Sequence, residues 1–163
     1  NLQFDQPLPQ ASREEAMGWR KACGARPIWV AASTHADEEA AVLDAHQRLR
    51  ERHPRALLLW APRHPERFDA VAARVVDAGL ELRRRSVDRG PDARCNVFLI
   101  DSLGELPGFL AAGDVAFVGG SLVPVGGHNT LEPAALGVPV LSGPHTFNFA
   151  EITALLKDVG ALE

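Results

Sequence analysis

Residues 119–133 read GGSLVPVGGHNTLEP, and an apolar run, Asp114 to Val118, leads directly into them. Glycine lets the backbone approach a ligand closely and adopt a positive φ at little steric cost. A short helical pattern follows the second glycine pair and carries His128, Asn129 and Glu132. The start of a helix offers free N–H groups and the positive end of a dipole, which suit an anion such as a phosphate. We interpret this strand–loop–helix unit as a pocket for a nucleotide or a nucleotide sugar.

Outward from this stretch, the chain alternates strand and helix patterns almost throughout. Apolar runs of strand length predict strands at 27–32, 56–60, 80–84, 96–100, 114–118 and 138–141. Helical spacing predicts helices at about 13–22, 37–52, 65–77, 103–112, 129–136 and 148–157. Strands that read as continuous Val, Ile and Leu runs are buried on both faces. The fold class is therefore α/β, with an open parallel sheet and helices on both of its faces.

Local signals predict the helix ends and the place of the loops. Ser12-x-x-Glu15 is a capping-box pattern, Pro65 suits the first residue of a helix, and Gly79 suits a helix end. Right-handed crossovers put every strand-to-helix loop at the same edge of a parallel sheet, where ligands bind. We therefore expect the loops near residues 33–35, 63–65, 101–102, 119–128 and 142–147 to converge.

The composition fits a single globular domain: 163 residues, 46% of them hydrophobic, with a net charge of −4. Residues 48–94 hold 12 of the 17 Lys and Arg against 7 acidic residues. This excess fits a phosphorylated ligand but lacks the density of a nucleic-acid binder, and solvated helix faces would give a similar count. No apolar run is long enough to span a bilayer. Cys23 and Cys95 form neither a disulfide framework nor a zinc pattern, so we expect buried free thiols.

Two roles are open for Asn129 and Glu132. In the first role, both residues serve only to start the helix: Asn129 is a good N-cap, and Glu132 stands at the capping-box position three residues later. Capping explains neither the glycine pairs nor His128, which favours ligand binding. An ionised Glu132 offers two oxygens that can accept hydrogen bonds from two ribose hydroxyls.

Two further loops contribute candidate residues. Arg63 follows a strand, and its guanidinium suits a bidentate contact with a phosphate. The alternative is that it belongs to a solvated surface loop. We favour phosphate binding for Arg63 and the solvated loop for Arg67. The hydroxyls of Ser33 and Thr34 either cap the next helix or bind a phosphate. The histidine spacings match no common zinc pattern, so no metal ion is expected. No residue stands out as a general base.

Several motifs occur in order along the chain. They read ASTH-x-x-EE at 32–39, PRHPERF at 62–68, GGS at 119–121, GGHN-x-LEPA at 126–134, G-x-PV at 137–140 and GPH-x-FNF at 143–149. Together they closely resemble the 3-deoxy-D-manno-octulosonic acid (Kdo) transferases, from the first residues of the chain nearly to the last. The resemblance implies a GT-B glycosyltransferase, in which two Rossmann-like domains face each other across a cleft.

By this resemblance, residues 1–10 are an interdomain linker and residues 11–163 are the C-terminal, Rossmann-like, donor-binding domain. The whole enzyme is expected to transfer Kdo from the donor CMP-Kdo to the lipid A precursor of lipopolysaccharide, without a metal ion or another cofactor. It is expected at the cytoplasmic face of the inner membrane of Gram-negative bacteria. The family's catalytic base, acceptor surface and membrane contact belong to its N-terminal domain. We therefore expect this chain to be soluble, to bind the donor and to be inactive alone.

The residues that match the family's donor site are Arg63, His64, Gly119, Gly120, Ser121, Gly126, Gly127, His128, Asn129 and Glu132. The resemblance implies that Arg63 holds the CMP phosphate, that Glu132 holds the ribose, and that Asn129 lies near phosphate and sugar. His64 and His128 match the motif without an assigned role. Val140 stands where many retaining glycosyltransferases have a second glutamate, so a general retaining-type interpretation loses support. Two alternatives stay open: a GT-B enzyme that uses a UDP-sugar, and a nucleotide-sensing module without transferase activity.

Overall fold

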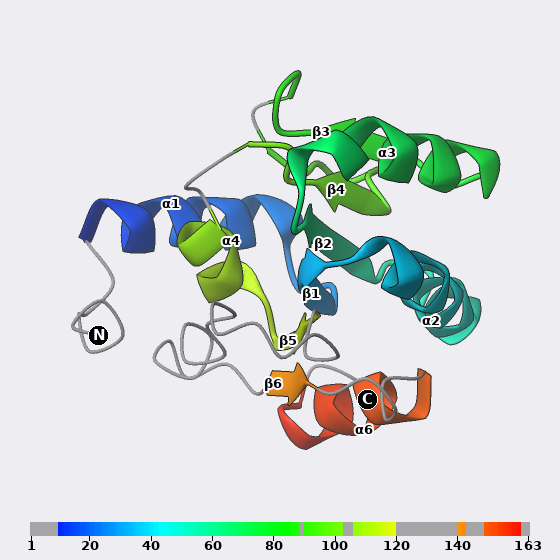
Figure 1. Cartoon of the computed structure of the whole chain (residues 1–163). Helices are drawn as coiled ribbons and strands as arrows, with labels where there is room; N and C mark the ends of the chain where they lie inside the picture. The colour runs from blue at the N-terminus through cyan, green and yellow to red at the C-terminus, as the bar shows by residue number, and fades with distance from the viewer. Residues whose placement is uncertain (1–9, 89, 103–105, 120–139, 143–148, 161–163) are drawn as a thin grey trace.

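The computed structural model describes residues 10–88, 90–102, 106–119, 140–142 and 149–160 (Figure 1). Within these ranges, six parallel strands form one sheet in the order β3-β4-β2-β1-β5-β6. The strands are β1 (Ile28–Thr34), β2 (Leu57–Pro62), β3 (Leu82–Arg84), β4 (Val97–Leu99), β5 (Val115–Val118) and β6 (Val140–Ser142). The helices are α1 (Gln10–Cys23), α2 (Glu39–Arg52), α3 (Phe68–Asp77), α4 (Leu106–Ala112) and α6 (Phe149–Asp158). Short 3₁₀ turns, η2 (Ala36–Glu38) and η3 (Pro65–Arg67), precede α2 and α3.

Helices cover both faces of the sheet, as Figure 1 shows. α2, α3 and α6 share one hydrophobic core with the sheet, which includes Trp29 and Trp60. α1 and α4 share a second core on the opposite face, which includes Val30 and Phe98. Successive residues of β1 alternate between the two cores, and nearly the whole strand is buried, because both faces of the sheet are covered. The predicted α/β class is confirmed, and the helix predicted at 129–136 lies outside the described residues.

Of the three sequence signals for helix ends, those at Pro65 and Gly79 are confirmed and the capping box at Ser12 is wrong. Pro65 is the first residue of η3, which leads into α3, and Gly79 follows that helix with a φ of +81°. α1 begins at Gln10, two residues before the capping-box residue Ser12 and inside the stretch predicted as a linker. A cap contributes only about 1 kcal/mol, so good helix formers such as Ala11 extend a helix past it. Residues 1–9 of the predicted linker lie outside the described residues.

Arg20 and Arg26 connect several segments at the amino ends of the strands. Arg20 of α1 donates to the carboxylate of Asp114 at 3.1 Å, and that carboxylate accepts the N–H of Ile28 at 2.9 Å. The Arg26 side chain is 3% exposed and donates to three backbone carbonyls, which lie on the segments before β2 and β4. Burial lowers the pKa of Arg26 below its usual value. These contacts join α1, β1, β2, β4 and β5 at the end of the sheet opposite the ligand edge.

The two cysteines are buried free thiols, as predicted. Burial raises the pKa of Cys95 to about 12 and also raises that of Cys23. Neither thiol is therefore ionised near neutral pH. None of the helices in the described ranges is long and apolar enough to cross a membrane.

Candidate functional site

The order of the strands creates a switch point between β1 and β5. The chain runs from β1 to β2 on one side of β1, and it returns through β4 and α4 to β5 on the other side. In open α/β sheets, ligands bind in the crevice outside the carboxyl ends of the strands at such a point. His35 directly follows β1, and Gly119, the first residue of the glycine-rich stretch, directly follows β5. The sheet thus brings the start of that stretch to the place where this fold offers a ligand crevice.

Gly119 lies tightly against the loop after β1. Its N–H donates to the carbonyl of Ala32 at 2.8 Å. A Cβ atom at position 119 would lie 2.5 Å from Oε1 of Glu38 and 2.9 Å from Cα of Thr34. Real Cβ atoms do not approach other atoms so closely, so any side chain here would push the two segments apart. Glycine at this position is therefore required by the packing of β5 against the β1 loop.

The β1 loop is fixed by its own backbone and by β2. Ser33 has a φ of +55°, a rare conformation for a residue other than glycine, and the β1–β2 register shifts at this point. The buried Thr34 hydroxyl accepts the indole N–H of Trp60 at 2.9 Å, and the Thr34 carbonyl accepts the N–H of Arg63 at 2.9 Å. The Thr34 hydroxyl is therefore held inside the fold.

The helix start after β1 differs from the capping alternative and does not test phosphate binding by Ser33 or Thr34. The N-cap of η2 is His35, and its N–H donates to Oε1 of Glu38 at 2.8 Å. Capping by Ser33 or Thr34 was therefore a wrong prediction. The positive φ of Ser33 delays the helix by one to two residues, and the side chain of Glu38 supplies the oxygen that binds the first backbone N–H.

Arg63 and His64, two of the predicted site residues, follow β2 and are both exposed. The ring of His64 lies edge to face with that of His35, with 5.3 Å between centroids and 88° between planes. The guanidinium of Arg63 forms no ion pair with any residue that the structure describes. An unpaired guanidinium can make a bidentate contact with a phosphate or a carboxylate. The loops after β1 and β2 thus meet, as predicted, and present a cationic side chain.

Arg67 has a structural role, and its interpretation as a solvated residue was wrong. Its Nε and Nη2 atoms donate to the two carboxylate oxygens of Glu39 at 2.9 and 2.6 Å. Arg74 Nε lies 3.3 Å from the same carboxylate, whose side chain is 0% exposed. Arg67 and Arg74 are seven residues apart, about two helical turns, so both face α2. That spacing is a signal in the sequence, but nothing local to residues 67–74 identifies Glu39 as their partner.

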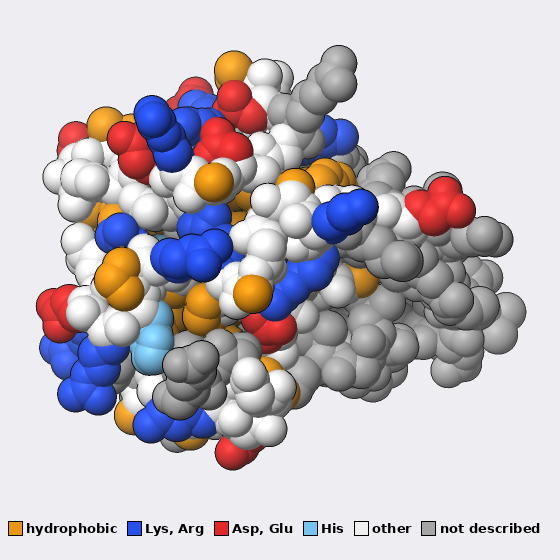
Figure 2. Space-filling model, turned by 180° about the vertical axis from the view of Figure 1, so that it is seen from behind, with side chains coloured by type: hydrophobic (Ala, Val, Ile, Leu, Met, Phe, Trp, Pro, Cys, Tyr) orange, Lys and Arg blue, Asp and Glu red, His pale blue; other side chains and the backbone are white. Residues whose placement is uncertain are grey.

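Five arginines of the 48–94 region form ion pairs within the described residues: Arg48, Arg67, Arg74, Arg83 and Arg84. Arg84 donates to Asp69 and Asp101 at 2.8 Å each, and Arg83 donates to Asp92 at 3.0 Å. Burial acts to raise the pKa of Asp101, but hydrogen bonds from Ser86 and Arg84 outweigh it and hold that pKa below its usual value. Figure 2 shows the consequence on one face, where basic side chains are interspersed with acidic ones. Part of the local charge excess is thus used in ion pairs within the fold, and Arg63 is among the arginines that form none with the described residues.

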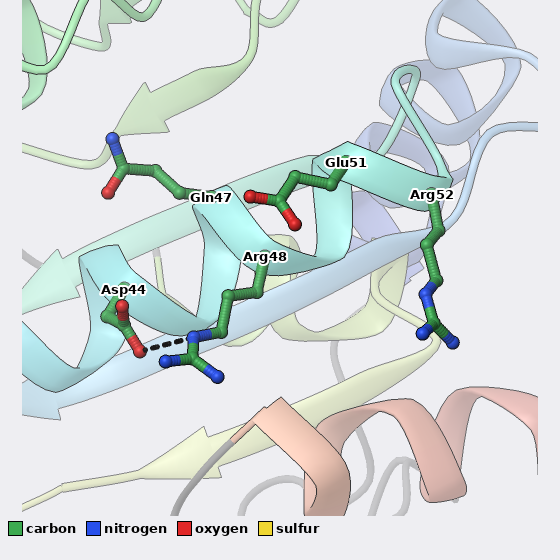
Figure 3. Close-up of a pocket in the computed structure, with 5 residues that line it drawn as sticks. All are labelled: Asp44, Gln47, Arg48, Glu51 and Arg52. Carbon is green, nitrogen blue, oxygen red and sulfur yellow. Dashed lines mark ion pairs between the residues drawn. The ribbon is translucent and has the colours of Figure 1, made fainter.

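A hollow of about 570 Å³ lies along the outer face of α2 (Figure 3). It is lined by Asp44, Gln47, Arg48, Glu51 and Arg52, all from one helix. Arg48 and Asp44 pair across one helical turn at 3.1 Å, and both are exposed. These residues stand in the later turns of α2, whose first turn lies at the ligand edge of the sheet. None of the predicted site residues that the structure describes, Arg63, His64 and Gly119, lines this hollow.

The structure places three of the ten predicted site residues. Arg63, His64 and Gly119 lie on the loops after β2 and β5, at the carboxyl edge of the sheet. The other seven lie outside the described residues and stay predictions: Gly120, Ser121, Gly126, Gly127, His128, Asn129 and Glu132. Among the residues that are described, no three His, Cys, Asp or Glu side chains are grouped so as to hold a metal ion. Sequence reasoning did not identify Glu38, which links the loops after β1 and β5.

Comparison with known proteins identifies the family, although no family model matches the chain. The chain is 50% identical over 139 residues to a 3-deoxy-D-manno-octulosonic acid transferase of Haemophilus influenzae, and 46% identical over 155 residues to one of Bordetella pertussis. These alignments cover 85% and 93% of this chain but 33% and 36% of the relatives. The chain therefore spans about a third of the length of these enzymes.

A solved structure shows which third it is. The crystal structure of the C-terminal CMP-Kdo binding domain of WaaA from Acinetobacter baumannii aligns with a TM-score of 0.77 and 38% sequence identity. The alignment covers 92% of this chain and 79% of that domain. Both the sheet with its helices and the sequence are thus shared over nearly the whole length. The chain belongs to the 3-deoxy-D-manno-octulosonic acid transferase family of glycosyltransferases and corresponds to their C-terminal domain.

Proposed function

We propose that this chain is the donor-binding domain of a lipid A Kdo transferase and that it binds CMP-Kdo. The observation that carries the proposal is the switch point of the sheet between β1 and β5, where Gly119 opens the glycine-rich stretch. Arg63, on the neighbouring loop after β2, forms no ion pair with any described residue. The family's solved C-terminal domain, which is described as binding CMP-Kdo, supports the same ligand here. CMP-Kdo carries a phosphate and a sugar carboxylate, and both anions suit a site built from a guanidinium and backbone N–H groups.

We assign each part of the donor to residues of this chain, some of which lie outside the described ranges. Arg63 holds the phosphate, and His64 borders the same subsite. Glu132 accepts hydrogen bonds from the ribose hydroxyls, and Asn129 lies near phosphate and sugar. The turns at Gly119, Gly120, Ser121, Gly126 and Gly127, together with His128, line the remainder of the pocket.

The complete enzyme is proposed to transfer Kdo from CMP-Kdo to the lipid A precursor at the cytoplasmic face of the bacterial inner membrane. This chain spans about a third of its relatives, so we assign the catalytic base, the acceptor surface and the membrane contact to the rest of the enzyme. The chain alone is then expected to bind the donor nucleotide and to release no Kdo from it.

A titration of the chain with CMP tests the proposal, with UMP, UDP and cytidine as comparison ligands and calorimetry or NMR shifts as the readout. Saturable CMP binding in the range of about 1 μM to 1 mM, tighter than that of any comparison ligand, supports it. Tighter binding of UDP than of CMP would favour a UDP-sugar enzyme of the same fold. A folded sample that binds none of these nucleotides contradicts the assignment of the donor site to this domain.

A further inference from the structure

Glu38 is a buried carboxylate at the switch point of the sheet. The residue is 7% exposed and ends η2, directly before α2. Carboxylates rarely lie this deep unless they accept hydrogen bonds, since burial of an unpaired charge is unfavourable. Its Oε1 atom accepts the N–H of His35 at 2.8 Å. The carboxylate therefore holds the first residue after β1 in place.

The same oxygen atom also faces the end of β5. A Cβ atom at Gly119 would lie 2.5 Å from Oε1 of Glu38 and 3.0 Å from the carbonyl oxygen of Ser33. Gly119 is thus in contact with both the carboxylate and the β1 loop, and its own N–H pairs with Ala32 of β1 at 2.8 Å. One side chain therefore sets the spacing between the two segments that border the crevice.

The neighbouring Glu39 provides an internal comparison. It is fully buried, and its carboxylate faces Arg67 and Arg74 of the η3–α3 segment. Successive residues of a helix point about 100° apart, so the two carboxylates serve different contacts. Glu39 joins two helices, whereas Glu38 contacts His35 and Gly119 at the ligand edge of the sheet.

We infer that Glu38 is a positioning residue for donor binding: its carboxylate fixes the β1 loop against Gly119 and so sets the width of the crevice between β1 and β5. The inference rests on the proposed donor site. Glu38 acts through the backbone of His35 and through Gly119, without a contact to the nucleotide of its own. Loss of the carboxylate would free the His35 N–H and leave an empty space beside Gly119, and the loop would then sample other positions.

The test compares three variants of this chain: Glu38→Ala, Glu38→Gln and, as the matched control, Glu39→Gln. Glu38→Ala is expected to weaken CMP binding about tenfold at a temperature well below unfolding, because the His35 N–H loses its partner. Glu38→Gln keeps an oxygen at the same place and is expected to restore the affinity to within about threefold of wild type. Glu39→Gln is expected to lower the unfolding temperature yet leave the CMP affinity within about twofold.

Amide hydrogen exchange supplies a readout that does not depend on a nucleotide. In Glu38→Ala, the amides of His35 and Gly119 are expected to exchange about tenfold faster than in wild type, whereas Glu38→Gln and Glu39→Gln keep wild-type rates there. Unchanged protection of both amides in Glu38→Ala, or an equal loss of CMP affinity in all three variants, overturns the positioning role. If the wild-type chain binds no CMP, the proposed function fails, and the exchange rates still decide whether Glu38 holds the loop.

Discussion

Arg67 and Glu39 form a bidentate ion pair, with Nε and Nη2 of Arg67 at 2.9 and 2.6 Å from the two oxygens of a carboxylate that is fully buried. The pair connects the first turn of α2 to the turn that opens α3. Both elements follow strands that end at the ligand edge of the sheet. The ion pair therefore joins α2 to the η3–α3 segment on one face of the sheet.

Removal of the buried charge is expected to destabilise the fold. Glu39→Gln leaves Arg67 and Arg74 without their anionic partner, and breaking a buried pair in this way costs about 3 kcal/mol of unfolding free energy. Urea denaturation monitored by circular dichroism measures the effect. Asp44→Asn, which breaks the exposed Asp44–Arg48 pair on the same helix, is the control and should cost less than about 0.5 kcal/mol. Equal losses of unfolding free energy in the two variants would show that the burial of Glu39 does not increase the contribution of its ion pair to stability.

His46 makes the stability of the fold depend on pH. Trp29 donates its indole N–H to Nδ1 of His46 at 2.9 Å, so the neutral ring carries its proton on Nε2, which faces the carbonyl of Asn96 at 2.9 Å. Burial is the main cause that lowers the pKa of His46 from 6.5 to about 3. Below pH about 6.5 the unfolded chain binds a proton at His46 that the folded chain does not, so acid favours unfolding.

The expected result is a fall in unfolding free energy of up to about 1.4 kcal/mol per pH unit from His46 alone, between pH about 6 and 4. Stability above pH about 7 is unaffected by this group. His46→Gln removes the titrating ring, so its unfolding free energy should fall less steeply as the pH is lowered. This holds even though the variant is less stable at neutral pH. Equal slopes of unfolding free energy against pH in acid for wild type and His46→Gln would disprove the link between His46 protonation and unfolding.

Two glycines in different packing environments are expected to change the stability of the fold in opposite directions when replaced by alanine. A Cβ atom at Gly113 would lie 2.6 Å from Cγ2 of Val30 in the core, whereas one at Gly18 in α1 would meet nothing within 4 Å. Gly113→Ala should therefore lose about 1–3 kcal/mol through overpacking. Gly18→Ala should gain roughly 0.5–1 kcal/mol, because alanine restricts the unfolded chain and favours helix. Thermal unfolding of both variants measures the difference, and a stabilised Gly113→Ala would contradict the packing described at the end of α4.

Arg63 is expected to contribute to binding through the phosphate. Arg63→Ala should weaken CMP binding by roughly 1–3 kcal/mol and cytidine binding by much less, since cytidine has no phosphate. Arg55→Ala is the matched control, because Arg55 is also exposed but precedes β2 at the opposite edge of the sheet. Calorimetric titrations of the three proteins with both ligands give the comparison. Equal losses for CMP and cytidine would place Arg63 away from the phosphate.

Much of the fold could be predicted because its signals are local. The apolar runs in β1, β2, β4 and β5 are continuous because each strand is covered on both faces, and that pattern is visible in the sequence alone. Pro65 and Gly79 mark a helix start and a helix end through their own backbone preferences. The glycines at the end of β5 predicted a close approach to a ligand, which stays a prediction, whereas the structure shows Gly119 packed closely against the β1 loop.

The contacts between distant segments could not be predicted, since no local pattern carries the order of strands in a sheet. Glu38 and Glu39 are chemically identical neighbours in the sequence, where both simply complement a helix start. Only the placement of β5 beside β1 gives Glu38 its contact with Gly119, and only the packing of α3 on α2 gives Glu39 its two arginines. The sequence by itself determined the α/β alternation, the strand positions and the family, because these depend on residue type and spacing. The tertiary structure decided which polar groups meet, because hydrogen bonds and ion pairs form only over a few ångströms, between residues that folding alone brings together.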